Sequence, residues 1–159
     1  AAEHRNSCNI DDSGLLSTRP EVKFKKHEDA DFAMLEGSHT GYVPRHGLSH
    51  RRCLRLYENG EVLMGEEHLS GKSGVHYAAR FHLHPGIQAS IIGAGDEVLL
   101  RARSNTGWRF KVFGATLGIE DSVYGNEGEA PRRTLQLTLT GVTQGGPSTV
   151  SWELRREKL

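Results

Sequence analysis

The sequence lacks several features that would assign it to a large class of proteins. No run of about 18 apolar residues occurs, so no membrane-spanning helix is expected. Lys and Arg together number 20, as do Asp and Glu, and this balance gives no general attraction to nucleic acid or to an anionic membrane. A polyanionic partner would need a local basic patch. Cys8 and Cys53 are the only cysteines, and since they can pair or stay free, they do not identify a redox compartment.

Common catalytic signatures are also absent. The sequence has no CxxC pair, no ordered Ser-His-Asp set and no calcium loop rich in Asp and Asn. Segment 70–73 (SGKS) resembles the end of a phosphate-binding loop, but Glu66 stands where that motif requires its first glycine. We therefore do not expect a nucleotide site there.

The clearest positive signal is the alternation in segment 76–85 (HYAARFHLHP). Tyr77 and Phe81 fall on one parity with other apolar residues, whereas Arg80, His82 and His84 fall on the other. Strict alternation is typical of a half-buried β-strand. We expect one side of this strand to pack in a core and the other to face solvent or a ligand.

Similar runs recur along the whole chain, separated by clusters of Gly, Pro, Asn and Asp, and no helical period interrupts them. This pattern predicts an all-β fold, an antiparallel β-sandwich of roughly ten to twelve short strands, with residues 1–159 forming one domain. Trp108 and Trp152 are in phase with apolar neighbours, so we expect them to pack in the core rather than to stack on sugars. The expected strands are 21–26, 31–36, 49–57, 61–65, 76–84, 87–92, 97–103, 108–112, 116–120, 134–140 and 149–155.

The connections between these runs are predicted from turn residues. Asn59 and Gly60 stand between two alternating runs, which is a strong hairpin signal. Segments 37–47 and 65–74 are interpreted as polar loops because of their glycines and charged side chains. Arg132 and Arg133 are interpreted as ordinary charges that flank a strand.

Two groups of side chains carry the chemistry of the sequence. His82 and His84 lie on one face of one strand and can supply two ligands to zinc, but the sequence identifies no third ligand. We favour a role for them, together with Arg80, in hydrogen bonding to an anionic sugar or to a partner domain. The second group occupies residues 39–52.

This second group has a composition suited to proton abstraction. To remove a proton next to a carboxylate of the substrate, an enzyme needs a base, such as tyrosine or histidine, and a cation, such as arginine, that stabilises the enediolate. Residues 39–52 contain all three types. The alternative is a solvated loop followed by the polar face of a strand. We favour this alternative, because nothing in the spacing makes the groups converge.

Several motifs taken together resemble the C-terminal β-sandwich region of heparinase II/III-like proteins. The most specific are SHTGY (38–42), HRR (50–52) and RFHLHP (80–85), and the similarity extends over residues 6–156 through NTGWRF (105–110), IEDSVYG (119–125) and PRRTLQL (131–137). The resemblance implies a polysaccharide lyase, in which a helical toroid and β-sheet layers act together to cleave uronate-containing polysaccharides, including glycosaminoglycans, by β-elimination.

The catalytic residues of that family are expected on the helical domain and the first β-layer, and their motifs do not occur in this sequence. The resemblance therefore implies a C-terminal fragment that begins downstream of them, without catalytic residues or a cofactor of its own. The longer parent protein is expected to be the lyase and to hold a divalent metal such as zinc. The expected partners are the missing N-terminal helical catalytic domain and an acidic polysaccharide, with no nucleic acid and no membrane. The expected location is periplasmic or exported.

We therefore expect a non-catalytic domain that buttresses the catalytic domain and lines part of its cleft. The alternatives are an independent module that binds acidic carbohydrate and a purely structural interaction domain. The residues predicted to contact substrate are His39, Tyr42, Arg80, His82 and His84.

Overall fold

The structure of the protein is a computed structural model that describes residues 7–9, 21–29, 32–57, 60–103, 106–125 and 130–157, with only the backbone of 7–9. It confirms the all-β prediction. In the described part of the chain, no helix has the length and hydropathy needed to cross a bilayer. The elements are β1 (Ser7–Asn9), β2 (Val22–Glu28), β3 (Phe32–His39), α1 (Val43–His46), β4 (Leu48–Tyr57), β5 (Val62–Gly71), β6 (His76–His82), β7 (Gln88–Ile92), β8 (Glu97–Arg101), β9 (Gly107–Phe113), β10 (Thr116–Tyr124), β11 (Arg132–Val142) and β12 (Gly146–Glu157).

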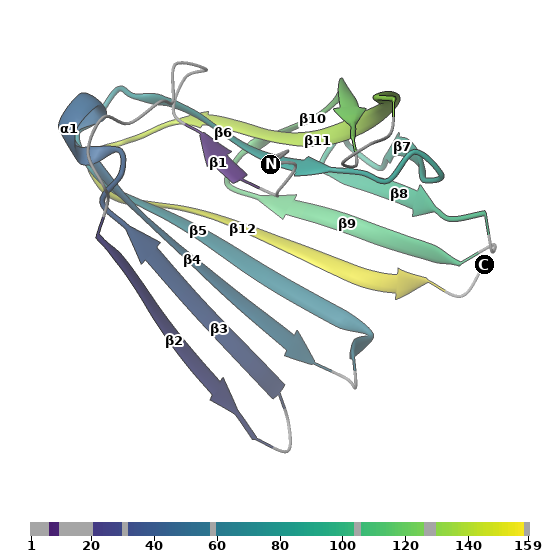
Figure 1. Cartoon of the computed structure of the whole chain (residues 1–159), viewed down its shortest axis with the longest axis horizontal. Helices are drawn as coiled ribbons and strands as arrows, with labels where there is room; N and C mark the ends of the chain where they lie inside the picture. The colour runs from purple at the N-terminus through teal and green to yellow at the C-terminus, as the bar shows by residue number, and fades with distance from the viewer. Residues whose placement is uncertain are drawn as a thin grey trace.

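The strands form two antiparallel sheets of unequal size (Figure 1). The smaller sheet has the order β1-β6-β11-β10, and the larger one has the order β2-β3-β4-β5-β12-β9-β8-β7. In Figure 1, β2, β3 and β4 fan away from β10 and β11. The larger sheet therefore has a part that the smaller sheet does not cover. We call the face of each sheet that points toward the other sheet its inner face.

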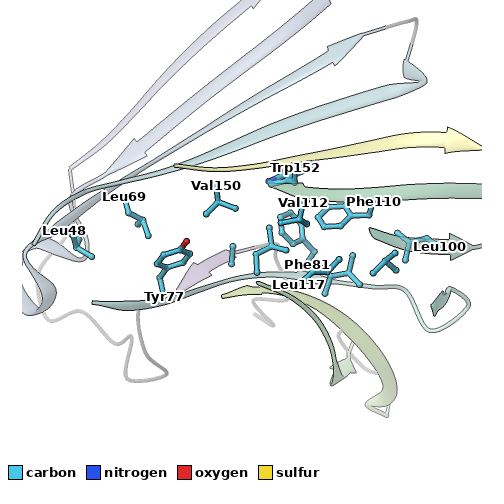
Figure 2. Packing of buried hydrophobic residues seen from close by; sticks show 14 residues of the cluster. Leu48, Leu69, Tyr77, Phe81, Leu100, Phe110, Val112, Leu117, Val150 and Trp152 are labelled. Atoms are coloured by element: carbon cyan, nitrogen blue, oxygen red, sulfur yellow. The ribbon is translucent and has the colours of Figure 1, made fainter. Parts of the chain in front are cut away.

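The core lies between the two sheets, as the alternation predicted (Figure 2). Phe81 of β6 packs against Phe110 of β9 and Trp152 of β12, with ring centroids 5.2 and 4.9 Å apart. The indole of Trp152 lies directly over the backbone of Gly65, where a Cβ atom would come within 2.1 Å of its ring carbons. Trp152 is buried and Trp108 packs against the core at its margin, so the expectation for both tryptophans is confirmed.

The prediction of a polar loop over 65–74 is wrong. β5 continues from Val62 to Gly71 and pairs with both β4 and β12 along its length. Its buried residues alternate through Gly65, Glu67 and Leu69. The alternation was hidden because a carboxylate, Glu67, occupies one of the core-facing positions.

The prediction of a loop over 37–47 is also only partly right. β3 extends to His39, and residues 43–46 form one helical turn with Pro44 in its first turn. Gly47 ends this turn with a φ of 66°, a left-handed conformation that glycine adopts without strain. The chain then enters β4 directly, which places the short helix beside the end of the larger sheet.

The hairpin expected at Asn59 and Gly60 is confirmed. Tyr57 at the end of β4 pairs with Val62 at the start of β5, so residues 58–61 connect two antiparallel neighbours. Asn59 itself lies outside the described residues. Gly60 has a φ of 95°, which explains the need for glycine at this position.

Candidate functional site

Arg80 and His82 lie on the outer face of the smaller sheet, opposite the core. Tyr77 and Phe81 of the same strand are buried, whereas Arg80 and His82 are half-buried, which confirms the predicted alternation. The Nδ1 atom of His82 lies 2.8 Å from the hydroxyl oxygen of Ser122, and the two groups form a hydrogen bond. His82 is thereby fixed to β10 across the intervening strand.

The same outer face is polar over its width. The amide of Gln136 donates to Glu120 at 3.1 Å, and the hydroxyl of Thr138 donates to the other oxygen of that carboxylate at 3.4 Å. Both donors are buried although they lie on the side away from the core. The outer face of the smaller sheet is therefore an ordered array of hydrogen-bonding groups.

His84 lies just beyond β6, at the rim of a separate hollow. Its Nδ1 atom accepts a hydrogen bond of 3.1 Å from the backbone N–H of Gly86, and its ring meets Tyr124 edge-on at 5.2 Å. The guanidinium of Arg132 lies 5.4 Å from the centre of the same Tyr124 ring. The hollow, which we call the arginine hollow, is lined by His84, Pro85, Gly86, Ile87, Ala102, Arg103 and Arg132.

His39 and Tyr42 lie elsewhere, at the end of the larger sheet beside α1. His39 pairs with His50 across β3 and β4, and both are on the inner face. The ring centroids of His39 and Tyr42 are 4.9 Å apart, and those of His39 and His50 are 5.1 Å apart. The structure thus divides the five predicted substrate residues into two groups. One group lies on the inner side of the larger sheet, and the other lies on the outer side of the smaller sheet; the first is His39 and Tyr42, and the second is Arg80, His82 and His84.

His39 is the end of a hydrogen-bonded chain that leads into the core. The backbone N–H of Gly41 donates to Nδ1 of His39, so the neutral ring carries its hydrogen on Nε2. That Nε2 lies 3.1 Å from Nδ1 of His50, and Nε2 of His50 lies 2.7 Å from Oε2 of Glu67. The three groups form a one-directional chain in which each imidazole donates toward the carboxylate.

Glu67 is the buried anchor of this chain, and only 1% of it is exposed. Its other oxygen accepts from Nε of Arg52 at 2.6 Å and from the indole N–H of Trp152 at 3.4 Å. Burial opposes ionisation, but the hydrogen bond from His50 and the charge of Arg52 outweigh it and hold the pKa of the Glu67 carboxyl below its usual range. Glu67 therefore remains an anion inside the core.

The chemistry of His39 follows from its place in this chain. Burial, followed by the neighbouring His50, lowers the pKa of His39. A low pKa suits a general base, yet both ring nitrogens of His39 and of His50 are already engaged in hydrogen bonds. The arrangement can fix the segment between β3 and β4 to the core, and it presents no imidazole nitrogen to a substrate.

Sequence reasoning missed Glu67 altogether, since its segment was interpreted as a loop. The available signal was the spacing of Gly65, Glu67 and Leu69, which continues the alternation of the preceding residues. His50 and Arg52 have the same two-residue spacing on the neighbouring strand, and Arg52 pairs with Glu67 in register. A buried carboxylate needs such partners.

A zinc site at His82 and His84 finds no support in the geometry. His82 is hydrogen-bonded to Ser122, while His84 is turned against Tyr124. Among the residues that the structure describes, no group of three or more His, Cys, Asp or Glu side chains is placed to hold a metal ion. Cys53 is a buried free thiol, and the side chain of Cys8 lies outside the described residues.

A further surface feature lies on the inner face of β2, β3 and β4, where the larger sheet extends beyond the smaller one. The ring of Phe24 lies on the backbone of Gly37, and 72% of Phe24 is exposed. None of the buried core residues of the described chain comes from β2 or β3. We call this surface the uncovered face, and its exposed apolar residues are Val22, Phe24, Leu35 and Leu56.

Comparison with known proteins finds a family model and a relative that match this sequence. A family model described as heparinase II/III-like, C-terminal, matches residues 1–153. The FtsZ-localized protein C of Caulobacter vibrioides is 32% identical over 155 residues, which are 89% of this chain and 26% of that protein.

Solved structures share the fold. The heparan sulfate lyase HepC from Pedobacter heparinus superposes with a TM-score of 0.81 at 11% identity, over 97% of this chain and 24% of that one. The heparinase III-BT4657 gene product gives a TM-score of 0.79 at 12% identity, over 96% of this chain and 24% of that one. The chain therefore spans about a quarter of the length of these relatives.

Proposed function

Because the chain belongs to the heparinase II/III-like C-terminal family, we propose that it is the non-catalytic C-terminal β-sandwich of a heparinase II/III-like polysaccharide lyase. In this role it braces the catalytic domain, lines part of its cleft and leaves the β-elimination of uronate-containing polysaccharide to the rest of the protein. The coverage of relatives supports the proposal, since three quarters of each relative lies outside the matched region. The proposal includes an exported or periplasmic location, which fractionation of cells producing the longer protein tests.

The uncovered face is the observation that carries the proposal. Phe24 and Leu35 lie on neighbouring strands, on the sheet face that elsewhere forms the core. Exposed apolar side chains that gather on one sheet face, here beside the ion pair of Lys26 and Glu28 on the edge strand, are characteristic of a contact with another domain or protein. Burying one such side chain contributes about 1.5–3 kcal/mol. We therefore assign this face to the contact with the helical catalytic domain.

The buried chain of Glu67, His50 and His39 supports a non-catalytic role. Elimination next to a uronate carboxylate requires a base with an available lone pair within hydrogen-bonding distance of the proton that is removed. In His39 the Nδ1 lone pair is taken by the N–H of Gly41, and in His50 it is taken by Nε2 of His39. The geometry favours a structural use of these imidazoles.

The test compares Phe24→Asp in the isolated 159-residue chain and in the longer lyase-like protein. In the isolated chain we expect a loss of no more than about 1 kcal/mol, from the contact of Phe24 with Gly37. In the longer protein we expect a drop of several degrees in the melting temperature of the β-sandwich, because a carboxylate enters an apolar contact. Loss of elimination activity, followed by the ultraviolet absorbance of the unsaturated product, is expected to accompany it.

Phe113→Asp is the matched control. Phe113 is 52% exposed and lies on the outer face of the same sheet, so its substitution should have equally small effects in both proteins. Equal effects of Phe24→Asp in the two proteins would contradict docking through this face. Elimination activity in the isolated chain would contradict the non-catalytic role.

A second candidate function is an independent module that binds acidic carbohydrate, and the arginine hollow favours it. Calorimetric titration of the isolated chain with uronate oligosaccharides at low salt distinguishes this module from a purely structural interaction domain. The module binds an acidic oligosaccharide, whereas the structural domain gives no heat with any of them.

A further inference from the structure

The arginine hollow brings together cationic groups from segments far apart in the sequence. Arg103 follows β8, Arg132 begins β11, and His84 follows β6. All three are exposed. Within the described part of the chain, neither Arg103 nor Arg132 faces a carboxylate in an ion pair, whereas other arginines do, such as Arg109 and Arg156. Among the residues that the structure describes, no carboxylate therefore neutralises the two guanidinium groups in the hollow.

Gly86 leaves the space in which these groups converge. A Cβ atom at Gly86 would lie 3.3 Å from Nδ1 of His84 and 3.8 Å from Nε of Arg103. His84 and Arg103 thus flank one point of the hollow, beside Gly86. A larger residue at this position would fill the space between them.

Two side chains of the hollow, Arg132 and His84, are held by contacts within the protein. The guanidinium of Arg132 lies over the ring of Tyr124, a contact that uses the face of the guanidinium rather than its N–H donors. Nδ1 of His84 accepts the N–H of Gly86, so the neutral ring carries its hydrogen on Nε2 as a further donor. Two guanidinium groups and an imidazole N–H that line one hollow are the donor types that bind an oxyanion.

We propose that the arginine hollow binds the carboxylate or sulfate group of an acidic sugar through Arg103, Arg132 and His84. This inference rests on the carbohydrate-binding function proposed above and names the site and the ligand group, while the docking function stands without it. Arg103 and Arg132 supply bidentate hydrogen bonds, and His84 supplies one more. The hollow is open to solvent, so a sugar ring can remain outside while its acidic group enters.

The experiment is a titration of the 159-residue chain at low salt, followed by calorimetry and by two-dimensional amide NMR. Four probes separate the ligand chemistries. Three are oligosaccharides of equal length, namely an oligouronate, a sulfated neutral oligosaccharide and the unmodified neutral oligosaccharide, and the fourth is inorganic sulfate. We expect one or both acidic oligosaccharides to bind and to shift the amide signals of Gly86 and its neighbours. The neutral oligosaccharide should not bind, and the acidic probe that binds identifies the carboxylate or the sulfate.

The variants Arg103→Gln and Arg132→Gln should each weaken binding about tenfold, as expected for the loss of a charge-assisted bidentate contact. Arg101→Gln and Arg133→Gln are matched controls, since each removes the same charge one or two positions away and outside the hollow. They should change the affinity less than about twofold, because exposed charges at a distance are screened.

Three results would overturn the proposal. The first is no binding of either acidic oligosaccharide, including the case in which inorganic sulfate binds and the site recognises only a free anion. The others are equal weakening by the control variants and signal shifts that avoid Gly86. None of these results bears on the effect of Phe24→Asp in the longer protein, so the docking function is judged separately.

Discussion

The substitution Glu67→Gln tests the most specific structural claim, that a buried carboxylate holds the end of the larger sheet together. Glutamine keeps the shape of the side chain but removes its charge and replaces one acceptor oxygen with a donor. The oxygens of Glu67 now accept from His50 at 2.7 Å and from Arg52 at 2.6 Å. In the variant, the amide NH2 confronts the N–H donor of either His50 or Arg52, and Arg52 loses the charge opposite it in both orientations.

The magnitude follows from burial. Breaking a buried ion pair by removing one partner costs about 3–5 kcal/mol, against a total stability of about 5–15 kcal/mol for a domain. Urea unfolding measures the change as a lower midpoint with an unchanged slope, because the surface exposed on unfolding is the same. We expect a loss of about 3–5 kcal/mol, which makes Glu67→Gln marginally folded.

Glu36→Gln is the matched control on the outer face of the same sheet. Glu36 pairs with Arg51 at 2.9 Å and Lys25 at 3.5 Å, both at the surface. Solvent screening limits such pairs to less than about 1 kcal/mol. A loss in Glu67→Gln no larger than that in Glu36→Gln would refute the claim that Glu67 is a buried structural anchor.

Three further predictions concern single groups. Burial and then His50 lower the pKa of His39 below its ordinary 6.5, so the unfolded chain takes up this proton first and the free energy of unfolding falls as pH drops below about 6.5. In urea titrations at pH 7 and pH 5, His39→Gln should therefore lose less stability between the two pH values than the unaltered chain. An equal loss in both would contradict the assignment. Gly65→Ala should lower stability by about 3 kcal/mol in thermal unfolding, because its Cβ would overlap the ring of Trp152; a neutral effect would show that the indole is mobile. Burial raises the pKa of the Cys53 thiol, so peptide mass spectrometry should find it unlabelled by iodoacetamide until denaturant is added, and rapid labelling of the folded chain would contradict its burial.

The parts of the fold that could be predicted are those where apolar and polar residues alternate without exception. In β6, Tyr77 and Phe81 stand against Arg80 and His82, and the two parities lead to opposite faces. Strand position follows from such a pattern because the side chains of a strand alternate every residue. The same reasoning did not predict the full length of β5, because Glu67, a charged residue, occupies a core position and is stabilised by partners on other strands.

The candidate sites were harder to predict because alternation gives the face of one strand and not the sheet that the strand joins. His39 and Arg80 were both interpreted as substrate residues, yet they belong to different sheets. Arg132 was interpreted as an ordinary flanking charge. Arg132 lies near His84 and Arg103 because the ends of β6 and β8 and the start of β11 lie close together in the fold. The local sequence pattern does not predict that arrangement.

The most direct test of the central claim, that the uncovered face docks on the catalytic domain, is hydroxyl-radical footprinting of the isolated chain and of the longer protein. This method measures the solvent exposure of individual side chains. In the isolated chain, Phe24, Leu35 and Phe113 should all be oxidised, because all three are exposed. In the longer protein, Phe24 and Leu35 should be protected while Phe113 is oxidised as before. Equal oxidation of Phe24 and Leu35 in both proteins would contradict docking through this face.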